Sequence, residues 1–418
     1  MFVIFNPSEQ LVPIKVWLPG PEHLDEVCRR QAMNLANLPF AFRHIALMPD
    51  THAGYGMPIG GVLATEDVII PNAVGVDIGC GMGFIHTDVP ASVLREVNTP
   101  NGSLAQYMVG NIMREVPQGF NHHKRPQPSK FLDKMVKQQK PNDPKRLFNY
   151  GHKKLPEIEE AYYQIGTLGG GNHFIELQED EEGLLGIMVH TGSRNIGYKV
   201  ASYFNDLARD MNRKMKSPVP LEHDLAYLPL DTKEAQGYID WMNFALEFAR
   251  HNRALIMERV RRIVFDALEK FAGISTIEIN MEVNAHHNYA ALEEHFGGRV
   301  WVHRKGAIRA EQGELGIIPG AMGSYSYIVE GLGNPESFNT SSHGAGRVMG
   351  RREAVRQFSL EEVMEDFREK DIVLGKQRKR DTAEEFFKAY KDIDEVMNNQ
   401  QDLVEPVLKL QTIAVVKG

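Results

Sequence analysis

The sequence predicts a mixed α+β fold. Short apolar runs bounded by glycine and proline fill the N-terminal third and recur between about residues 277 and 329, which is typical of strands that end in tight turns. Residues 237–272 instead repeat large apolar side chains at helical spacing, with charges between them. With 418 residues, 42% of them hydrophobic, the chain is long enough for either two domains or one large, elaborated domain.

The strands of the N-terminal third are predicted from three segments that carry short apolar runs. They are IALMPD, GYGMPIGGVLATEDVIIP and AVGVDIGCGMGFIHTDV. Two further strands are expected around GGGNHFIEL and LGIMVHTGS, because each apolar run is bounded by glycine or a polar cluster. The glycines at these boundaries allow sharp turns, which can aim polar side chains at a common centre.

A basic, proline-containing insertion is predicted at about residues 119–149. It holds eight Lys or Arg residues against two Asp, and the pattern of short apolar runs stops there. Two interpretations stay open. The segment is either a solvated loop with a short helix, or an arm that contacts nucleic acid.

The C-terminal half combines one long helix with further strands and helices. Trp241, Phe248 and Ile256 mark the apolar face of the helix predicted over residues 237–272, and this face is expected to lie in the core. The charged tail over residues 360–404 is predicted to be helical, and the final LQTIAVVKG to be a strand. No repeat of fixed period and no low-complexity tract interrupts these elements.

Composition restricts the classes of protein that the chain can belong to. A net charge of −8 argues against a globally basic nucleic-acid coat protein, although it leaves room for a local basic site. Two cysteines are too few for a disulfide framework, and the N-terminus lacks the pattern of a signal peptide. No run of 18 apolar residues suggests a membrane span. We therefore expect a cytoplasmic protein that does not cross a membrane.

Histidine and glycine coincide in short clusters along the whole chain. Glycine beside a polar side chain lets the backbone approach a ligand closely and leaves amide groups free to bind anions. Seven such clusters in one chain suggest one shared pocket. They are PDTHAGYG, VDIGCGMG, GGGNHFIEL, VHTGSRNIG, NAHHNYA, WVHRKGAIR and SSHGAGR, of which VDIGCGMG has a cysteine in place of a histidine and NAHHNYA has histidines without glycine.

Five residues in these clusters are candidate metal ligands. A lone D-x-x-C motif is a weak metal signal, because a single cysteine after a strand is more often a small buried hydrophobe, and a single histidine is more often a satisfied core residue. Taken together, the five offer oxygen, nitrogen and sulfur ligands for two ions with a bridging thiolate, which favours Mn²⁺ or Zn²⁺ over Mg²⁺ or Ca²⁺. They are Asp77, Cys80, His173, His190 and His287.

Cations recur near the same glycine-rich turns. A guanidinium group binds phosphate oxygens through a bidentate fork, so repeated arginines at such turns are what a phosphate-binding pocket needs. The alternative is a set of ordinary surface charges. The residues are Arg194, Lys305, Arg309, Arg347 and Arg351.

The motifs resemble one known family, in their order and over nearly the whole chain. VDIGCGM, GTLGGGNHFIEL, VHTGSRNIGY, HHNY, HRKGAIRA, PGAMGSYSYIVEG, SSHGAGR and the terminal VVKG are similar to the motifs of the RtcB family of RNA-splicing ligases. The resemblance implies an RtcB-like α+β fold, with mixed sheets and surrounding helices in a single large catalytic domain over residues 1–418. It also implies the joining of RNA 3′-phosphate or 2′,3′-cyclic phosphate ends to 5′-hydroxyl ends in tRNA splicing or RNA repair.

The resemblance further implies two Mn²⁺ ions per chain, GTP as cosubstrate and a histidine–GMP intermediate. An archease-like activator assists some members of the family. Cys80 would bridge the two ions, with His173 and His190 on one ion and Asp77 and His287 on the other, and His343 would be the histidine that becomes guanylylated. The matching GTP-binding positions are Asn172, Phe174, Glu176, Ser326, Gly344, Ala345, Gly346, Tyr390 and Lys417. The matching positions near RNA and phosphate are Asp50, Arg194, Lys305, Arg347 and Arg351.

The sequence departs from the family pattern in two places, and two rival functions stay open. Ala321 in PGAMG stands where many members have serine, and the insertion at 119–149 is poorly covered by the shared motifs. The first rival is a two-metal phosphodiesterase or phosphatase acting on RNA ends, which needs metals and arginines but no covalent guanylate. The second rival is a non-catalytic RNA-binding protein, which needs basic patches and exposed aromatics but no full ligand set.

Overall fold

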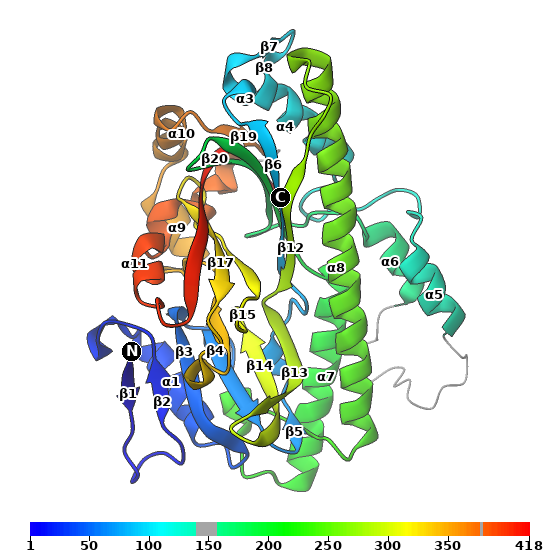
Figure 1. The fold of residues 1–418 in the computed structure, drawn as a ribbon. Coiled ribbons are helices and arrows are strands. Elements are labelled where there is room, and N and C mark those ends of the chain that lie inside the picture. The colour runs from blue at the N-terminus through cyan, green and yellow to red at the C-terminus, as the bar shows by residue number, and fades with distance from the viewer. Residues whose placement is uncertain (139–156, 377–378) are drawn as a thin grey trace.

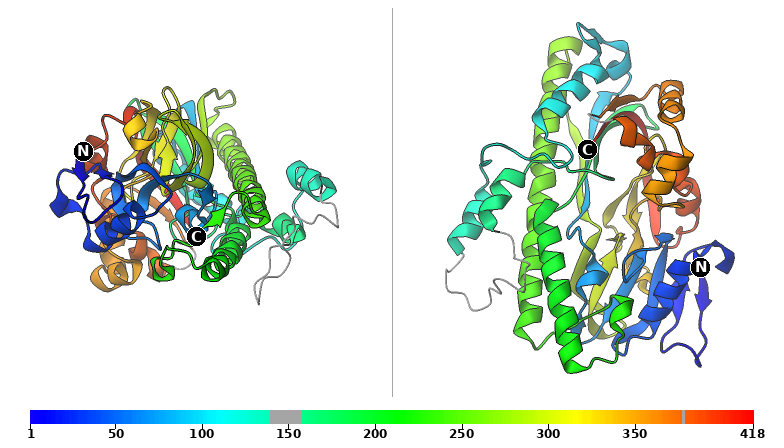
Figure 2. Two further views of the ribbon diagram at one scale, coloured as in Figure 1. Left: turned by 90° about the horizontal axis from the view of Figure 1, so that it is seen from below. Right: turned by 180° about the vertical axis from the view of Figure 1, so that it is seen from behind.

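The computed structural model describes residues 1–138, 157–376 and 379–418. Two large β-sheets form the centre of the molecule, and a pair of long helices runs along one side (Figures 1 and 2). The N-terminus lies at the edge of the smaller sheet, whereas the C-terminus lies near the middle of the molecule. The prediction of an α+β fold is therefore confirmed.

The larger sheet has eight strands and is antiparallel except at one short strand, β19 (Val373–Gly375), which runs parallel to β20. Residues from the middle and from the very end of the chain are neighbours in it, because the C-terminal strand inserts between β9 and β17. In spatial order the remaining strands are β12 (Ile279–His286), β6 (Gly81–Pro90), β10 (Leu184–Thr191), β9 (Phe174–Asp180), β20 (Val404–Lys417), β17 (Ser326–Gly331) and β16 (Leu315–Ile318).

The smaller sheet has six strands, and it meets the larger one where the chain passes from β12 to β13 through His287. Its strands are β1 (Phe2–Ile4), β2 (Ile14–Val16), β3 (Ala41–His52), β4 (Ile59–Thr65), β14 (Gly298–Lys305) and β13 (Asn288–His295). Three two-stranded ribbons complete the strands of the described residues: β5 (Val68–Ile69) with β11 (Leu228–Pro229), β7 (Asn98–Thr99) with β8 (Gly102–Ser103), and β15 (Ala307–Arg309) with β18 (Thr340–Ser342).

Helices cover the outer face of the large sheet and the ends of both sheets. Apolar residues of α4 and α8 form one hydrophobic core with the side chains that β6, β9, β10 and β20 direct outward. The helices are α1 (Glu26–Ala36), α2 (Pro71–Val74), α3 (Val93–Glu96), α4 (Leu104–Glu115), α5 (Lys130–Gln138), α6 (Ile158–Gln164), α7 (Arg194–Met215), α8 (Lys233–Ala267), α9 (Arg351–Gln357), α10 (Leu360–Glu369) and α11 (Ile393–Asn398). Of the helices in these ranges, none is both long enough and apolar enough to cross a membrane.

Particular residues determine where the long helix α8 begins and ends. α8 starts at Lys233, four residues before the predicted start, because the Thr232 hydroxyl accepts a hydrogen bond from the Ala235 amide at 3.2 Å and caps the first turn. It widens into a π-helical turn after Ala267 and stops at Gly273, which has a φ of +70°. Helix α7, which pairs with α8, is not among the predicted elements.

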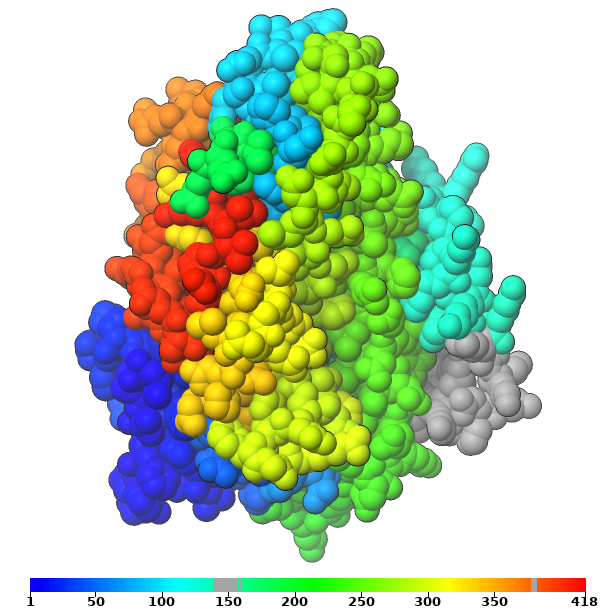
Figure 3. Space-filling model, viewed as in Figure 1, coloured from blue at the N-terminus to red at the C-terminus, as the bar shows by residue number. Residues whose placement is uncertain are grey.

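One predicted segment, the C-terminal tail, differs from the structure, and another, the basic insertion, is described only in part. The tail over residues 360–404 is only partly helical, because the strand β19 and short 3₁₀ turns separate α10 from α11. In the basic insertion, residues 119–138 form an extended, mostly exposed stretch followed by α5, a conformation that is compatible with both the solvated loop and the nucleic-acid-contacting arm. Together with α6, this helix stands out from the flank of the molecule (Figure 3). Residues 139–149 lie outside the described residues.

Candidate active site

Three antiparallel strands bring candidate ligands to one place on the inner face of the large sheet, which is the face opposite to α4 and α8. In β10, His190 pairs with Met82 of β6, and Cys80 stands two residues before Met82. The amide of His287, which follows β12, donates a hydrogen bond to the Cys80 carbonyl at 2.8 Å. Because alternate residues of a strand point to the same face, these side chains converge.

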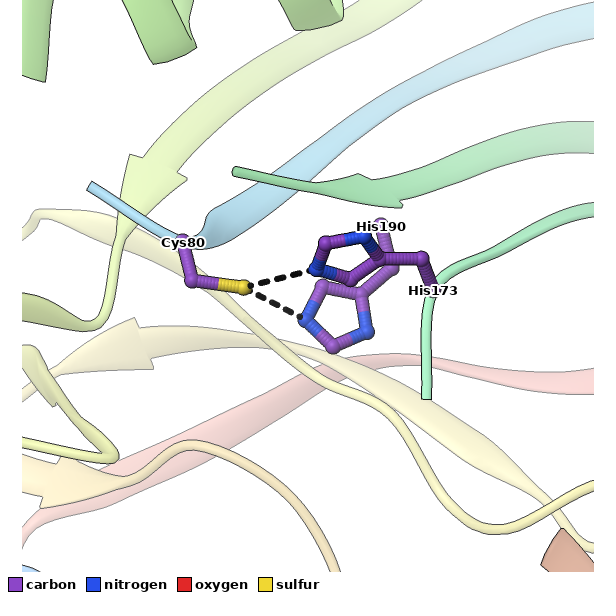
Figure 4. Close-up of side chains that lie close together, drawn as sticks. All are labelled: Cys80, His173 and His190. Carbon is purple, nitrogen blue, oxygen red and sulfur yellow. Dashed lines mark hydrogen bonds between the residues drawn. The ribbon is translucent and has the colours of Figure 1, made fainter. Parts of the chain in front are cut away.

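The side chains of Cys80, His173 and His190 form a buried cluster (Figure 4). The Cys80 sulfur lies 3.3 Å from His190 Nε2 and 3.4 Å from His173 Nε2. Asp77 Oδ2 lies 3.1 Å from His173 Nε2, and His287 Nε2 lies 3.4 Å from His190 Nε2. All five residues that the sequence singles out as ligands therefore meet in a single cluster.

The backbone selects the tautomer of the two central histidines. His173 Nδ1 lies 3.0 Å from the Leu168 carbonyl, and His190 Nδ1 lies 3.1 Å from the Asn172 carbonyl. A carbonyl oxygen can only accept, so each ring carries its proton on Nδ1 and directs an Nε2 lone pair at the Cys80 sulfur. This arrangement is typical of histidines that bind a metal.

Burial and charge in the cluster favour a cation at its centre. Burial, followed by neighbouring imidazoles, holds the pKa of His190 and of His287 well below the usual range, so both rings are neutral and able to act as ligands. Burial and the adjacent Asp77 carboxylate raise the pKa of the Cys80 thiol well above its ordinary value, so a thiolate there requires a compensating positive charge. Within the described residues, His287 Nδ1 is a buried atom without a hydrogen-bond partner. The donor set of nitrogen, sulfur and oxygen fits a transition metal or Zn²⁺.

His343 lies beside this cluster and is oriented by a buried carboxylate. Its ring centre is 4.7 Å from that of His287. Its Nδ1 lies 2.7 Å from Asp50 Oδ2, and its backbone amide donates to the same oxygen at 3.2 Å. Because an ionised carboxylate only accepts hydrogen bonds, His343 carries its proton on Nδ1 and leaves the Nε2 lone pair free to react.

Close backbone approach makes the pairing of Asp50 and His343 possible. Gly346 has a φ of +74°, and a Cβ atom there would lie 2.2 Å from the Asp50 carbonyl oxygen. A side chain at Gly306 would lie 2.9 Å from the His343 ring. Glycine at these two positions therefore lets three distant segments meet around the imidazole.

His343 also borders a pocket that opens beside the metal-ligand cluster. Predicted residues line most of it, including Ala321, the position that departs from the family pattern. The predicted residues on the wall are Asn172, Phe174, Glu176, His190, His343, Gly344, Ala345, Gly346, Arg347, Arg351, Tyr390 and Lys417. The wall residues that were not predicted individually are His52, Ile59, Pro319, Gly320, Met322 and Glu385. Four of them lie in predicted motifs, His52 in PDTHAGYG and the other three, Pro319, Gly320 and Met322, in PGAMGSYSYIVEG.

Strand register places an acid and a base on the wall of this pocket. In the pair of β9 and β20, Glu176 faces Val415 and Phe174 faces Lys417, so all four side chains lie on the inner face. Gln178 and Thr412 donate hydrogen bonds to Glu176 Oε2 at 2.7 and 3.2 Å. Burial raises the pKa of Glu176 to about 7, although Lys417 partly counteracts this effect.

Glu385 forms the centre of the positively charged wall of the pocket. It is 3% exposed, and it accepts hydrogen bonds from Tyr390 Oη at 2.5 Å and from Arg351 Nε at 3.0 Å. Arg347 Nη1 and Lys417 Nζ lie 3.4 and 3.6 Å from its oxygens. Burial alone would raise the pKa of Glu385, but these cations lower it to about 2. The sequence around it, DTAEEFFKAY, contains no histidine–glycine cluster that would have singled it out.

Besides Asp50, three of the residues predicted to bind GTP, RNA or phosphate are not on the wall of the pocket. Arg194 donates to Thr167 Oγ1 at 3.1 Å and to the Gly119 carbonyl at 3.0 Å, and these bonds hold it at a φ of +59°. Lys305 is buried and donates to two backbone carbonyls, and burial lowers its pKa to about 7. The hydroxyl of Ser326 accepts from the Gly320 amide at 3.2 Å, so it supports the pocket wall.

Comparison with known proteins agrees with this geometry. The family model described as "tRNA-splicing ligase RtcB" matches residues 31–418. The chain is 39% identical to the RNA-splicing ligase RtcB of Escherichia coli K12 over 97% of both chains. It is 34% identical to the tRNA-splicing ligase RtcB of Nanoarchaeum equitans, over 93% of this chain and 91% of that one. It is 31% identical to the RNA-splicing ligase RtcB of Mycobacterium tuberculosis, over 93% of this chain and all of that one. The match along almost the whole chain, together with the converged ligands and the oriented His343, shows that this protein belongs to the RtcB family of RNA-splicing ligases.

Proposed function

We propose that this protein is a GTP- and Mn²⁺-dependent RNA ligase that works as one catalytic domain over residues 1–418. It joins RNA 3′-phosphate or 2′,3′-cyclic phosphate ends to 5′-hydroxyl ends through a histidine–GMP intermediate. The observation that carries the proposal is the position of His343. Its ring lies beside the cluster of five candidate ligands and borders a pocket lined by cations and a buried acid, and its Nδ1 is bound to Asp50.

In the first step, His343 Nε2 attacks the α-phosphorus of GTP. The nitrogen–phosphorus bond forms as the bond to pyrophosphate breaks, and pyrophosphate leaves with the electron pair. The imidazole gains positive charge in this step. Asp50 stabilises it through the Nδ1 proton that it already binds, at a distance of 2.7 Å. The product is a phosphoramidate, which transfers its GMP readily.

The pocket supplies groups for both ends of the nucleotide. Glu176 and Lys417 form the guanine-binding end, where the acid accepts from the N1 and N2 hydrogens and the lysine donates to O6. Glu176 can do this because the two internal donors use only its Oε2. Arg351 lines the same pocket with only its Nε engaged by Glu385, and its remaining nitrogens pair with phosphate oxygens. Arg347 donates to Met349, Tyr390 and Glu384, so it contributes positive charge near the phosphates rather than a free bidentate fork.

Asp77, Cys80, His173, His190 and His287 would hold two Mn²⁺ ions. The ions would supply Lewis-acid stabilisation of charge that develops on the phosphate oxygens. The chain's own contribution is to hold the ligands in place and to keep the second nitrogen of His173 and His190 bonded to a carbonyl.

Two further transfers complete the reaction. An oxygen of the RNA 3′-phosphate attacks the phosphorus of the His343 adduct, and the imidazole leaves with its Nε2 lone pair restored. The 5′-hydroxyl oxygen of the second RNA then attacks the activated RNA phosphorus, and the bond from that phosphorus to the GMP oxygen breaks. GMP leaves with the electron pair, and the hydroxyl proton passes to solvent. A 2′,3′-cyclic end must first take up water to become a 3′-phosphate.

Incubation with Mn²⁺ and GTP labelled at the α-phosphate, followed by denaturing electrophoresis, tests the proposal. The label should remain on the protein, it should be stable in alkali and lost in acid, and it should map to His343. His343→Ala should form no adduct, yet it should join some RNA that already carries a 3′-terminal, pyrophosphate-linked guanosine. Hydrolysis of phosphate esters without any labelled protein would instead establish the phosphodiesterase alternative.

A further inference from the structure

Three exposed aromatic rings are carried by segments that lie next to the metal-ligand cluster. Phe120 is wholly exposed, Tyr198 is 55% exposed and Tyr163 is 38% exposed. Among the residues that the structure describes, none of these rings has an aromatic partner. We call this group the aromatic rim.

Hydrogen bonds connect the rim to the backbone that holds His173. The amide of Gly119, next to Phe120, donates to the Gly169 carbonyl at 2.8 Å, and the following Gly170 lies against Gly119. Arg194 donates to the Gly119 carbonyl at 3.0 Å, and Tyr198 follows it by one helical turn in α7. The Tyr163 carbonyl accepts from the amide of His123, three residues after Phe120. The segments that carry the rim are therefore joined to one another and to the backbone that holds His173.

Positive charge accompanies these rings. Lys124 and Arg125 follow Phe120 and are exposed. Neither makes an ion pair within the part of the chain that the structure describes. In a chain with a net charge of −8, these two cations favour a negatively charged partner at this place.

We propose that the aromatic rim binds unpaired nucleotides of the RNA next to the end that is being joined. The bases stack on Phe120 and its neighbouring tyrosines, and Lys124 and Arg125 contact the adjacent phosphates. This inference rests on the proposed function, because it assigns a docking surface to the RNA substrate of that same reaction. It also gives a role to the first part of the basic insertion.

Unpaired RNA is the partner that fits best. Exposed aromatic rings bind nucleic acids by stacking on base faces, which are accessible in single strands but covered in a duplex. The combination of rings with unpaired cations is typical of single-strand binding surfaces, and an acidic peptide would use the cations but not the rings.

The first test separates the RNA-dependent steps from the first step. Phe120→Ala should raise the apparent KM for RNA about tenfold, in keeping with the loss of one stacked base. Adduct formation from labelled GTP involves no RNA and should proceed at the normal rate. Phe120→Trp should restore RNA binding, because it restores the stacking face. The matched control is Phe5→Ala, which removes another exposed ring, 49% exposed, near the edge strand β1. It should leave the KM for RNA unchanged.

The second test identifies stacking itself. The substrates are RNA fragments in which one nucleotide next to the ligated ends is abasic, and each position is tested in turn. When the abasic nucleotide is at the stacked position, the wild-type protein should join the fragments about tenfold less well. Phe120→Ala should show no further loss at that position. The assignment of the rim would be overturned if the abasic nucleotide lowered joining by the same factor in the wild-type protein and in Phe120→Ala. An unchanged KM for RNA in Phe120→Ala would also overturn it. Either result is independent of the proposed function, whose failure would appear as the absence of the labelled adduct in the wild-type protein.

Discussion

Two successive rows of paired residues cross the large sheet and have different roles. One row consists of His190, Phe174 and Lys417, which pair across β10, β9 and β20 and face the pocket. The next row consists of Val189, Ile175 and Val416, which pair across the same strands and face α4 and α8. The two rows differ by a single position along each strand, because successive side chains point to opposite faces.

The comparison shows how a rigid scaffold positions reactive groups. The apolar row is almost completely buried, and its packing against the helices holds the register of the strands. A slip of one residue would turn the histidine and the lysine into the hydrophobic core and the valines into the pocket. We therefore expect substitutions in the polar row to affect chemistry, and substitutions in the apolar row to affect stability.

The largest effect is expected on the pocket side of the sheet, at Cys80. Cys80→Ser removes the soft, shared ligand, so the purified protein should lose metal, and both adduct formation and joining should fall by about a thousandfold or more. Metal analysis and the labelling assay measure these losses. The matched control is Cys28→Ser, which changes the other buried cysteine and should retain both metal and activity. Full metal occupancy in Cys80→Ser would remove this residue from the site.

The apolar row should show the opposite pattern. Ile175→Ala leaves a cavity between the sheet and the helices, so it should lower the free energy of unfolding by about 2–5 kcal/mol. Ile175→Val should lower it by only about 1 kcal/mol. Urea denaturation measures both changes. At low temperature the folded Ile175→Ala protein should still bind metal and form the adduct. If Ile175→Ala lost the adduct without a decrease in the free energy of unfolding, the apolar row would also affect the chemistry.

A smaller effect is expected at Glu176. Its side chain faces the pocket, whereas the side chains of its neighbours Ile175 and Leu177 face the hydrophobic core. Glu176→Gln should weaken discrimination of GTP from ATP by about tenfold, because one charged hydrogen bond to guanine is replaced by a neutral one. The apparent KM for each nucleotide in the labelling assay measures this change.

The same variant tests the role of the raised pKa. Glu176 has a pKa of about 7, above the ordinary value for a glutamate, so its carboxylate is present above pH 7 and becomes protonated as the pH falls through that value. Only the carboxylate accepts from both guanine donors. The KM for GTP in the wild-type protein should therefore rise as the pH falls below about 7, and this rise should disappear in Glu176→Gln. A rise of equal size in both proteins would assign the pH dependence to another group.

The sequence by itself determined the class of fold and most of the candidate site. Alternating short apolar runs and a long helical stripe are local patterns, so they predict strands and helices without knowledge of the contacts between them. The glycine-flanked histidines and the D-x-x-C motif are also local, and the five candidate ligands that they indicate lie close together in the structure, whereas their binding of metal stays a prediction. The 360–404 tail was harder to predict, because its charged residues pack against distant segments that override helical propensity.

Only the tertiary structure decided how these residues are used. Asp50 orients His343 although 293 positions separate them, and Glu385 gathers cations from α9 and from the end of β20. Arg194 and Lys305 carry the right charge for phosphate, yet their side chains are bound to hydroxyl or carbonyl groups within the protein. The physical reason is that a hydrogen bond depends on the distance and direction between two groups, and the folding of the whole chain determines both for residues that lie far apart in the sequence.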